Sequence, residues 1–244
     1  MSAVRVDGVL NFRDAGGMPA GAGSIRAGVV FRSGHLARVQ PGGVRVLQEL
    51  GIRRIVDLRD DLEVAALPTP PPLRELALRA PVFAGSMESF LAQDHTLAEV
   101  YRRMVDDSGP RLVAAVRALT QDWPALIHCT AGKDRTGVAI ALALSAAGAD
   151  LDAVVADYAR SESSLPPARH AQVRDYLRRT YPGSRHAEEL AVCSPAPVMR
   201  RLLGDVTERF GGVPAYLIAH GMAGDEVDDL RRILWSGPVP SPGR

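Results

Sequence analysis

The sequence is poor in cysteine and in lysine. Its 244 residues include 2 cysteines, too few for a disulfide scaffold, and this scarcity favours a reducing compartment such as the cytoplasm. Lysine occurs once, at Lys133, although lysine and arginine together number 29. The compact ammonium group of lysine binds a phosphate differently from the planar guanidinium group of arginine. Lys133 is therefore a candidate functional residue.

Long apolar runs and an excess of one charge are absent as well. No stretch reaches the roughly 20 apolar residues that cross a bilayer, and residues 1–10 carry no apolar core of a secretory signal. The formal net charge is +1, which gives no reason to expect a nucleic-acid partner or a membrane-surface protein. We expect a cytoplasmic protein without an integral membrane segment, and non-classical secretion stays open.

The most informative stretch covers residues 128–137, His-Cys-Thr-Ala-Gly-Lys-Asp-Arg-Thr-Gly. The apolar residues 124–127 before it predict a strand, and the apolar residues 138–147 after it predict a buried helix. A strand, a tight loop and a helix N-terminus together form a cradle for an oxyanion. Such a cradle favours the nucleophilic thiolate form of Cys129. Arg135 can bind two phosphoryl oxygens through its planar fork.

This pattern is the Cys-x5-Arg-Thr signature of cysteine-dependent phosphatases. The hydroxyl of Thr136 can stabilise the cysteine sulfur, and His128 is expected to hold the loop by hydrogen bonds. The predicted phosphate-binding residues are Thr130, Ala131, Gly132, Lys133, Asp134 and Arg135. These donors make a metal unnecessary, so we expect no metal and no other cofactor.

A nucleotide-binding P-loop is excluded by the same residues. That motif requires a glycine five positions before the Gly-Lys pair, and a serine or threonine directly after it. Ile127 stands at the first of these positions, and Asp134 follows Lys133. The loop therefore belongs to a different class of phosphate site.

The order of predicted elements indicates an α/β fold with a mainly parallel central sheet flanked by helices. Strands are expected at residues 28–34, 54–59, 74–78 and 124–127, and only helices beyond residue 150. Asp57 and Arg59 lie near the carboxyl end of a strand, where sites gather in such sheets, and we expect them to brace the pocket as a pair. We expect one domain over residues 1–236 and a disordered tail over residues 237–244.

Several motifs, taken in order, resemble the bacterial protein tyrosine phosphatase B family over nearly the whole chain. They are Asn-Phe-Arg-Asp-x-Gly-Gly at 11–17, Phe-Arg-Ser-Gly at 31–34, Asp-Leu-Arg-x3-Glu at 57–63, the loop at 128–137, Ala-Asp-Tyr-x-Arg-Ser at 156–161 and Gly-Gly-Val-x-x-Tyr-Leu at 211–217. The resemblance implies a cysteine phosphatase acting on phosphotyrosine proteins or peptides, sometimes on phosphoserine or phosphothreonine, and in some members on phosphoinositides. It also implies a helical lid, which we place within about residues 161–210.

The expected mechanism has two steps. Cys129 attacks phosphorus to give a phosphocysteine, and water then hydrolyses it. The leaving oxygen needs a proton from a general acid. The resemblance implies Asp134 for this role, while Asp60 and Asp61, which follow a strand, are rival acids. Phosphate-like oxyanions should inhibit the reaction.

Other functions stay open at this point. A phosphoinositide phosphatase would use the same chemistry, and Lys133 is compatible with its extra phosphates. A non-catalytic phosphate-binding module is a remoter alternative. A redox enzyme such as an arsenate reductase normally needs further thiols, and only Cys193 remains. Arg13 and Arg32 can serve either substrate recognition or the structure.

Overall fold

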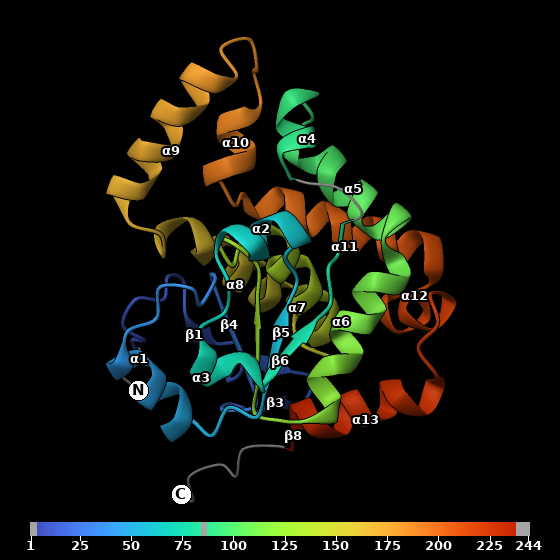
Figure 1. Ribbon diagram of the computed structural model, residues 1–244. Coiled ribbons are helices and arrows are strands. Elements are labelled where there is room, and N and C mark those ends of the chain that lie inside the picture. The colour runs from blue at the N-terminus through green and yellow to red at the C-terminus, as the bar shows by residue number, and fades with distance from the viewer. Residues whose placement is uncertain (1–3, 84–86, 238–244) are drawn as a thin grey trace, which may run out of the picture.

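The computed structural model describes residues 4–83 and 87–237 and contains a five-stranded sheet in the order β1-β4-β7-β5-β6 (Figure 1). The strands are β1 (Arg13–Asp14), β4 (Val30–Ser33), β7 (Ala125–His128), β5 (Arg54–Asp57) and β6 (Ala77–Arg79). Four strands run parallel, and β1 pairs with β4 in the antiparallel sense at one edge. The predicted mainly parallel sheet is confirmed.

Alternation of side chains along the strands gives the sheet two buried faces. Phe31, Leu126 and Ile55 lie in register on adjacent strands and pack toward α1 (Pro41–Glu49) in one cluster. Their neighbours Val56 and Ile127 belong to the larger cluster on the opposite face. This period of two is the expected consequence of strand geometry, and it places one helical layer on each side of the sheet.

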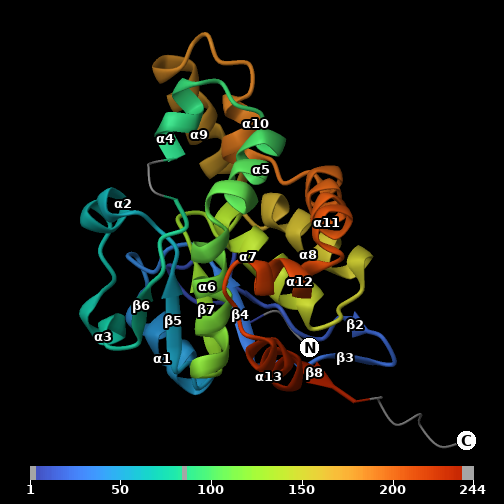
Figure 2. The same cartoon turned by 90° about the vertical axis from the view of Figure 1, so that its right-hand side faces the viewer.

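The thicker helical layer surrounds α7 (Asp134–Ala146), which is buried at every position except Ser145 (Figure 2). The prediction of a buried helix after the loop is confirmed, although it begins at Asp134 because the loop is shorter than expected. The other helices of this layer are α5 (Leu97–Asp107), α6 (Gly109–Gln121), α8 (Leu151–Ser163), α11 (Ala196–Phe210), α12 (Val213–Ala219) and α13 (Gly224–Leu234).

Three helices group at the top of both views: α4 (Met87–Ala92), α9 (Pro167–Thr180) and α10 (Ala187–Val192). The region predicted as a lid therefore consists of two parts that pack differently. The buried face of α11 belongs to the main core, whereas α9 buries only Leu177. No helix in the described part of the chain is both long and apolar enough to traverse a membrane.

Two parts of the fold differ from the sequence-based expectation. The strand expected at residues 74–78 is β6 at Ala77–Arg79, because the preceding prolines start the short helix α3 (Pro71–Arg74). A small sheet of β2 (Pro19–Ala20), β3 (Gly23–Ile25) and β8 (Trp235–Ser236) was not expected, because its first two strands flank a glycine-rich turn. Residues 238–244 of the predicted tail lie outside the described residues.

Candidate active site

The predicted loop connects the central strand β7 to helix α7. Cys129 directly follows β7, and α7 begins at Asp134. Cys129 is 2% exposed and Arg135 is 3% exposed, so nucleophile and guanidinium are both removed from bulk water. The first amides of α7, which lack partners within the helix, lie at the loop, where they favour an anion.

Donors outside the loop hold its backbone carbonyl groups. The hydrogen bonds run from His128 Nδ1 to the Cys129 oxygen (3.2 Å), from the His35 amide to the Thr130 oxygen (3.1 Å), and from Asn11 Nδ2 to the oxygens of Ala131 (3.1 Å) and Gly132 (2.9 Å). In a trans peptide each carbonyl points opposite to the following N–H. The amides of residues 130–133 therefore face away from these donors, into the space where a phosphoryl group would lie.

Gly132 allows the loop to make this turn. Its φ is +69°, and a Cβ atom at this position would lie 2.3 Å from the carbonyl carbon and oxygen of Ser33. Side chains other than glycine are disfavoured at that φ, and no side chain fits that space. The glycine inside the motif is thus a steric requirement of the loop.

A buried ionic network lies beneath the loop. Asp157 on α8 accepts hydrogen bonds from Arg13 Nε and Arg32 Nη1, both at 2.7 Å. Ser161 accepts from both arginines, and Arg32 Nη2 donates to the Gly132 oxygen at 2.9 Å. Burial acts to raise the pKa of Asp157, but the charges of the two arginines outweigh it and lower the pKa. Arg13 and Arg32 therefore support the loop in this structure.

Glu63 holds the arginine of the loop. Its carboxylate accepts two hydrogen bonds from Arg135, at 2.5 and 2.7 Å, and one from the Thr130 hydroxyl. Burial acts to raise the pKa of Glu63, but the hydrogen bonds and charge of Arg135 outweigh it and lower the pKa to about 2. Glu63 therefore stays ionised and orients the guanidinium group. The motif at 57–63 contained Glu63, but we assigned it no role from the sequence.

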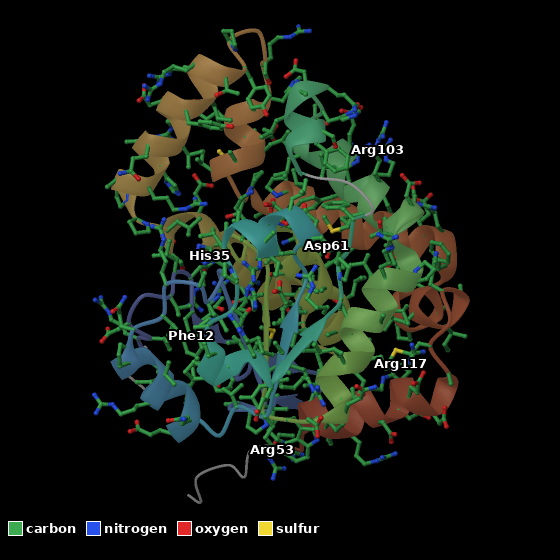
Figure 3. All side chains as sticks on the ribbon, viewed as in Figure 1. Phe12, His35, Arg53, Asp61, Arg103 and Arg117 are labelled. Atoms are coloured by element: carbon green, nitrogen blue, oxygen red, sulfur yellow. The ribbon has the colours of Figure 1, made fainter. Side chains whose placement is uncertain are left out.

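The rival acids Asp60 and Asp61 lie at the start of α2 (Asp61–Ala66). Asp60 caps this helix: its carboxylate accepts the Glu63 amide at 2.8 Å, while Glu63 accepts the Asp60 amide at 2.9 Å. Asp61 pairs with Arg79, and its side chain is 99% exposed (Figure 3). Asp60 is thus engaged as a cap, and Asp61 points to solvent.

Lys133 is buried against the end of α10. Its ammonium group donates to Asp134 Oδ1 at 2.6 Å and to the backbone oxygens of Leu190 (3.1 Å) and Cys193 (2.7 Å). These contacts use the three donors of an ammonium group. In this conformation Lys133 joins the loop to the end of α10, so its predicted contact with phosphate requires those bonds to exchange and stays a prediction.

Asp134, the predicted general acid, lies in a polar cluster at the start of α7. Its Oδ1 also accepts the hydroxyl of Tyr101 at 2.9 Å, and the Tyr101 oxygen accepts the hydroxyl of Tyr158 at the same distance. Burial and the charge of Asp134 raise the pKa of Tyr101 well above its ordinary value, so the phenol stays a donor. Tyr101 was missed because its spacing in α5 is that of a core residue.

Asp57 and Arg59 form the predicted pair. Asp57 accepts Arg59 Nε at 2.9 Å and Nη2 at 2.7 Å, while Arg59 Nη1 donates to the Leu67 oxygen. His128 Nδ1 lies 3.8 Å from Asp57 Oδ1. Burial lowers the pKa of His128 despite the charge of Asp57, so the imidazole is neutral at pH 7. This geometry suits a bracing role for all three residues.

The predicted residue Thr136 and the second cysteine, Cys193, make fewer contacts. The Thr136 hydroxyl is buried without a hydrogen-bond partner among the described residues, so its predicted contact with the Cys129 sulfur is not formed here. Cys193 lies at the end of α10, and both cysteines are free thiols. Within residues 4–83 and 87–237 no group of three or more His, Cys, Asp or Glu side chains is arranged to hold a metal ion.

Comparison with known proteins shows that the chain is similar to protein phosphatases. A model described as the tyrosine phosphatase family matches residues 4–236. The triple specificity protein phosphatase PtpB of Mycobacterium tuberculosis is 28% identical over 96% of this chain and 99% of its own. A tyrosine-protein phosphatase of Nostoc commune is 26% identical over 86% of this chain and 75% of its own. P. aeruginosa TpbA covers 77% of this chain and 92% of its own at 19% identity, but its TM-score of 0.36 is too low to carry an argument.

Proposed function

The chain belongs to the tyrosine phosphatase family, and on this premise we propose that residues 129–135 bind the phosphate of phosphotyrosine and transfer it to Cys129. The protein is a cysteine-dependent phosphatase, and its substrates are phosphorylated molecules. The observation that carries the proposal is that the carbonyl oxygens of residues 129–132 accept hydrogen bonds from donors outside the loop. The amides of residues 130–133 are therefore directed toward one phosphoryl group.

The reaction conserves atoms and charge in two displacements. The Cys129 sulfur forms a bond to phosphorus as the bond from phosphorus to the phenolic oxygen breaks, and the protonated Asp134 gives its proton to that oxygen. Water then attacks phosphorus, the sulfur leaves as thiolate, and Asp134 takes up the proton of the water. Arg135 and the loop amides stabilise the charge on the equatorial oxygens in both steps.

We favour phosphotyrosine over an inositol phosphate as the substrate. The case for a phosphoinositide rested on Lys133, and its donors are engaged by the lid and Asp134. The relative named a triple specificity phosphatase supports a wider range that includes phosphoserine and phosphothreonine. Oxyanions that resemble phosphate should compete for the same amides.

We assign the lid to α9 and α10 within a single domain over residues 1–236. Support for the lid is that Lys133 bonds the end of α10 while Arg169 of α9 stands beside the loop. We place the protein in a reducing compartment such as the cytoplasm, because catalysis needs Cys129 as a free thiol and both cysteines are free. Cell fractionation followed by activity assay would test this location.

The decisive experiment is a substrate panel assayed in chelator for the parent and for Cys129→Ser. The panel holds a phosphotyrosine peptide, a phosphoserine peptide and a phosphoinositide. We expect phosphate release by the parent and a loss of about 10⁴-fold or more in Cys129→Ser, because the hydroxyl is barely ionised. Circular dichroism controls for folding. Equal activity of the two proteins would contradict covalent catalysis, and no release by folded parent from any substrate would contradict the function.

A further inference from the structure

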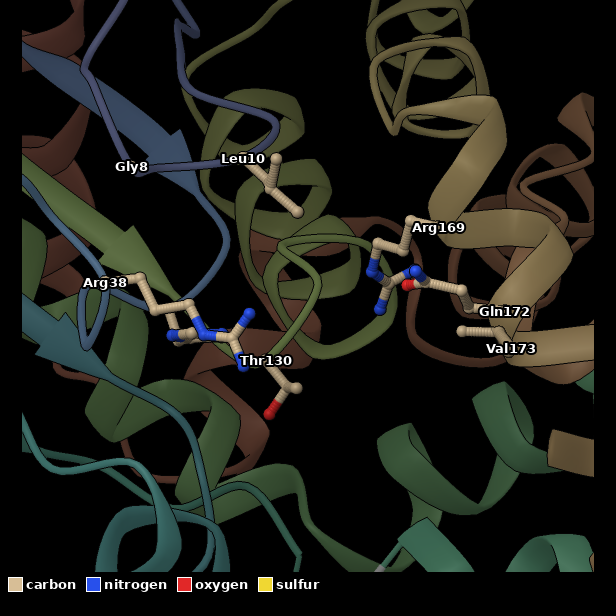
Figure 4. Close-up of a pocket in the computed structure, with 8 residues that line it drawn as sticks. Gly8, Leu10, Arg38, Thr130, Arg169, Gln172 and Val173 are labelled. Carbon is tan, nitrogen blue, oxygen red and sulfur yellow. The ribbon is translucent and has the colours of Figure 1, made fainter.

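A cavity of about 360 Å³ opens directly beside the catalytic loop. Its wall includes Thr130, the residue after Cys129, together with Leu10, His35 and two arginines. Figure 4 shows Arg38 and Arg169 reaching from opposite sides into the space above Thr130. A group in this cavity would therefore adjoin a phosphate held by the loop.

The two arginines of the cavity lack the partners that other arginines near the loop have. Neither Arg38 nor Arg169 forms an ion pair with a carboxylate of the described residues, and Arg169 Nη1 is buried without a hydrogen-bond partner. By contrast, Arg13 and Arg32 share Asp157. A buried donor without a partner loses the hydrogen bond that water would otherwise supply. The cavity thus offers unused donors to a ligand with acceptor oxygens.

Electrostatics around the cavity favour an anion. Glu63, whose carboxylate accepts the Thr130 hydroxyl, is neutralised by its pair with Arg135. Burial lowers the pKa of Arg169, and the charges of Cys129 and Asp134 oppose that change, so Arg169 lies within electrostatic range of the nucleophile. Burial and neighbouring positive charges lower the pKa of His35 to about 4, which leaves it neutral at pH 7.

We propose that this cavity binds a second phosphate group of a phosphopeptide whose first phosphotyrosine occupies the catalytic loop. The inference rests on the proposed function. Two facing guanidinium groups match a dianionic phosphate, since each offers a planar fork of donors. Leu10 and Val173 in the wall can contact the hydrocarbon part of the peptide side chain that carries the second phosphate. The enzyme therefore prefers doubly phosphorylated segments.

The test compares two peptides of one sequence, one with a single phosphotyrosine and one with a second phosphotyrosine at the next position. We expect the parent to show a higher kcat/KM for the second peptide. Arg38→Ala and Arg169→Ala should each lower the ratio of the two kcat/KM values about tenfold, as for one lost charge-assisted contact. The matched control is Arg178→Ala, because Arg178 is exposed on the same helix as Arg169 and does not line the cavity. The ratio should not change in this control.

If an arginine variant loses turnover, the preference for the doubly phosphorylated peptide can still be measured as a difference in binding affinity. In a Cys129→Ser background, fluorescence anisotropy should show that each arginine substitution weakens binding of the doubly phosphorylated peptide about tenfold more than that of the singly phosphorylated one. Circular dichroism confirms that each variant is folded.

Four outcomes would overturn the inference. Turnover of both peptides with equal kcat/KM by the parent removes the subsite and leaves the phosphatase function intact, whereas no turnover of any peptide removes the function itself. A ratio that falls equally in Arg178→Ala removes the assignment to this cavity. A soluble inositol bisphosphate that the parent prefers over the doubly phosphorylated peptide, with the same dependence on Arg38 and Arg169, removes the peptide as the occupant.

Discussion

The catalytic loop has a floor and a mouth that differ in their chemistry. The floor consists of Arg13, Arg32 and Asp157 with Asn11 and Ser161, and all of these residues are buried. Most of their donors bond to carboxylate, hydroxyl or carbonyl oxygens, including the carbonyls of the loop, whereas Arg32 Nε is buried without a hydrogen-bond partner among the described residues. The mouth consists of Glu63 on α2, Arg169 on α9, Lys133, which bonds the end of α10, and Arg38, which lines the cavity.

The difference follows from what each side must do. The amides that stabilise the transition state act best when they are already in place, so the floor is built into the packed core. Substrate has to enter and product has to leave through the mouth, so its contacts must break and re-form. Accordingly α8, which supplies Asp157, buries five residues, whereas α9 buries one. We therefore expect the floor to contribute to the stability of the protein and the mouth to contribute to its specificity.

Removal of the floor should have the largest effect on stability. Arg32→Ala leaves Asp157 with one arginine and removes one of the two donors to the Gly132 carbonyl, so we expect a loss of about 3–5 kcal/mol in the free energy of unfolding. Urea unfolding measures this loss. The control is Arg179→Ala, which removes an exposed pair with Asp175 and should change stability by less than about 0.5 kcal/mol. Equal losses in the two variants would contradict the structural role of the floor.

Asp134 lies between floor and mouth, and its substitution should change rate more than stability. Asp134→Asn cannot donate the proton, so kcat for an alkyl phosphate such as a phosphoserine peptide should fall about 100-fold. An aryl phosphate should lose less, because phenolate leaves with less help. Steady-state kinetics on p-nitrophenyl phosphate and the peptide measure both effects. If the two substrates lost activity equally, Asp134 would be a structural brace.

Substitution of Glu63 tests the role of a residue in the mouth. Glu63→Gln keeps the shape of the side chain but removes the charge that orients Arg135, so kcat/KM should fall about tenfold while the free energy of unfolding falls by about 1 kcal/mol. The matched control is Glu226→Gln, since Glu226 forms a similar two-bond pair with Arg117 away from the loop. Activity of this control should equal that of the parent. An unchanged kcat/KM in Glu63→Gln would show that Arg135 needs no orienting carboxylate.

The smallest effect concerns pH. The pKa of Glu63 is about 2 in the folded protein and ordinarily 4.5, so its contribution to stability is complete above about pH 4.5 and is lost as pH falls toward 2. Because the side chain is partly exposed, we expect a contribution of about 1 kcal/mol. Urea unfolding of the parent and Glu63→Gln at pH 6, 4 and 3 measures it. The difference between the two proteins should shrink as pH falls, and a constant difference would contradict the assignment.

The strand, loop and helix around Cys129 could be predicted because their signals are local. A buried strand, a glycine and an apolar helix follow one another within residues 124–147, and each element has its own pattern. The same holds for the pair of Asp57 and Arg59, which lie two positions apart. The parallel sheet followed from the alternation of such segments.

The support for the loop and the shape of its mouth arose only in the tertiary structure. Glu63 lies 72 positions from Arg135, and Asn11 lies 121 positions from Gly132, so no local pattern joins them. Lys133 could be singled out because it is the one lysine of the sequence, but its partners include the backbone oxygens of Leu190 and Cys193. Every residue carries such an oxygen, and therefore no side-chain pattern marks which of them will accept. The sequence by itself determined the chemistry of the nucleophile and its cradle, whereas long-range packing decided which groups hold that cradle and which remain free at its mouth.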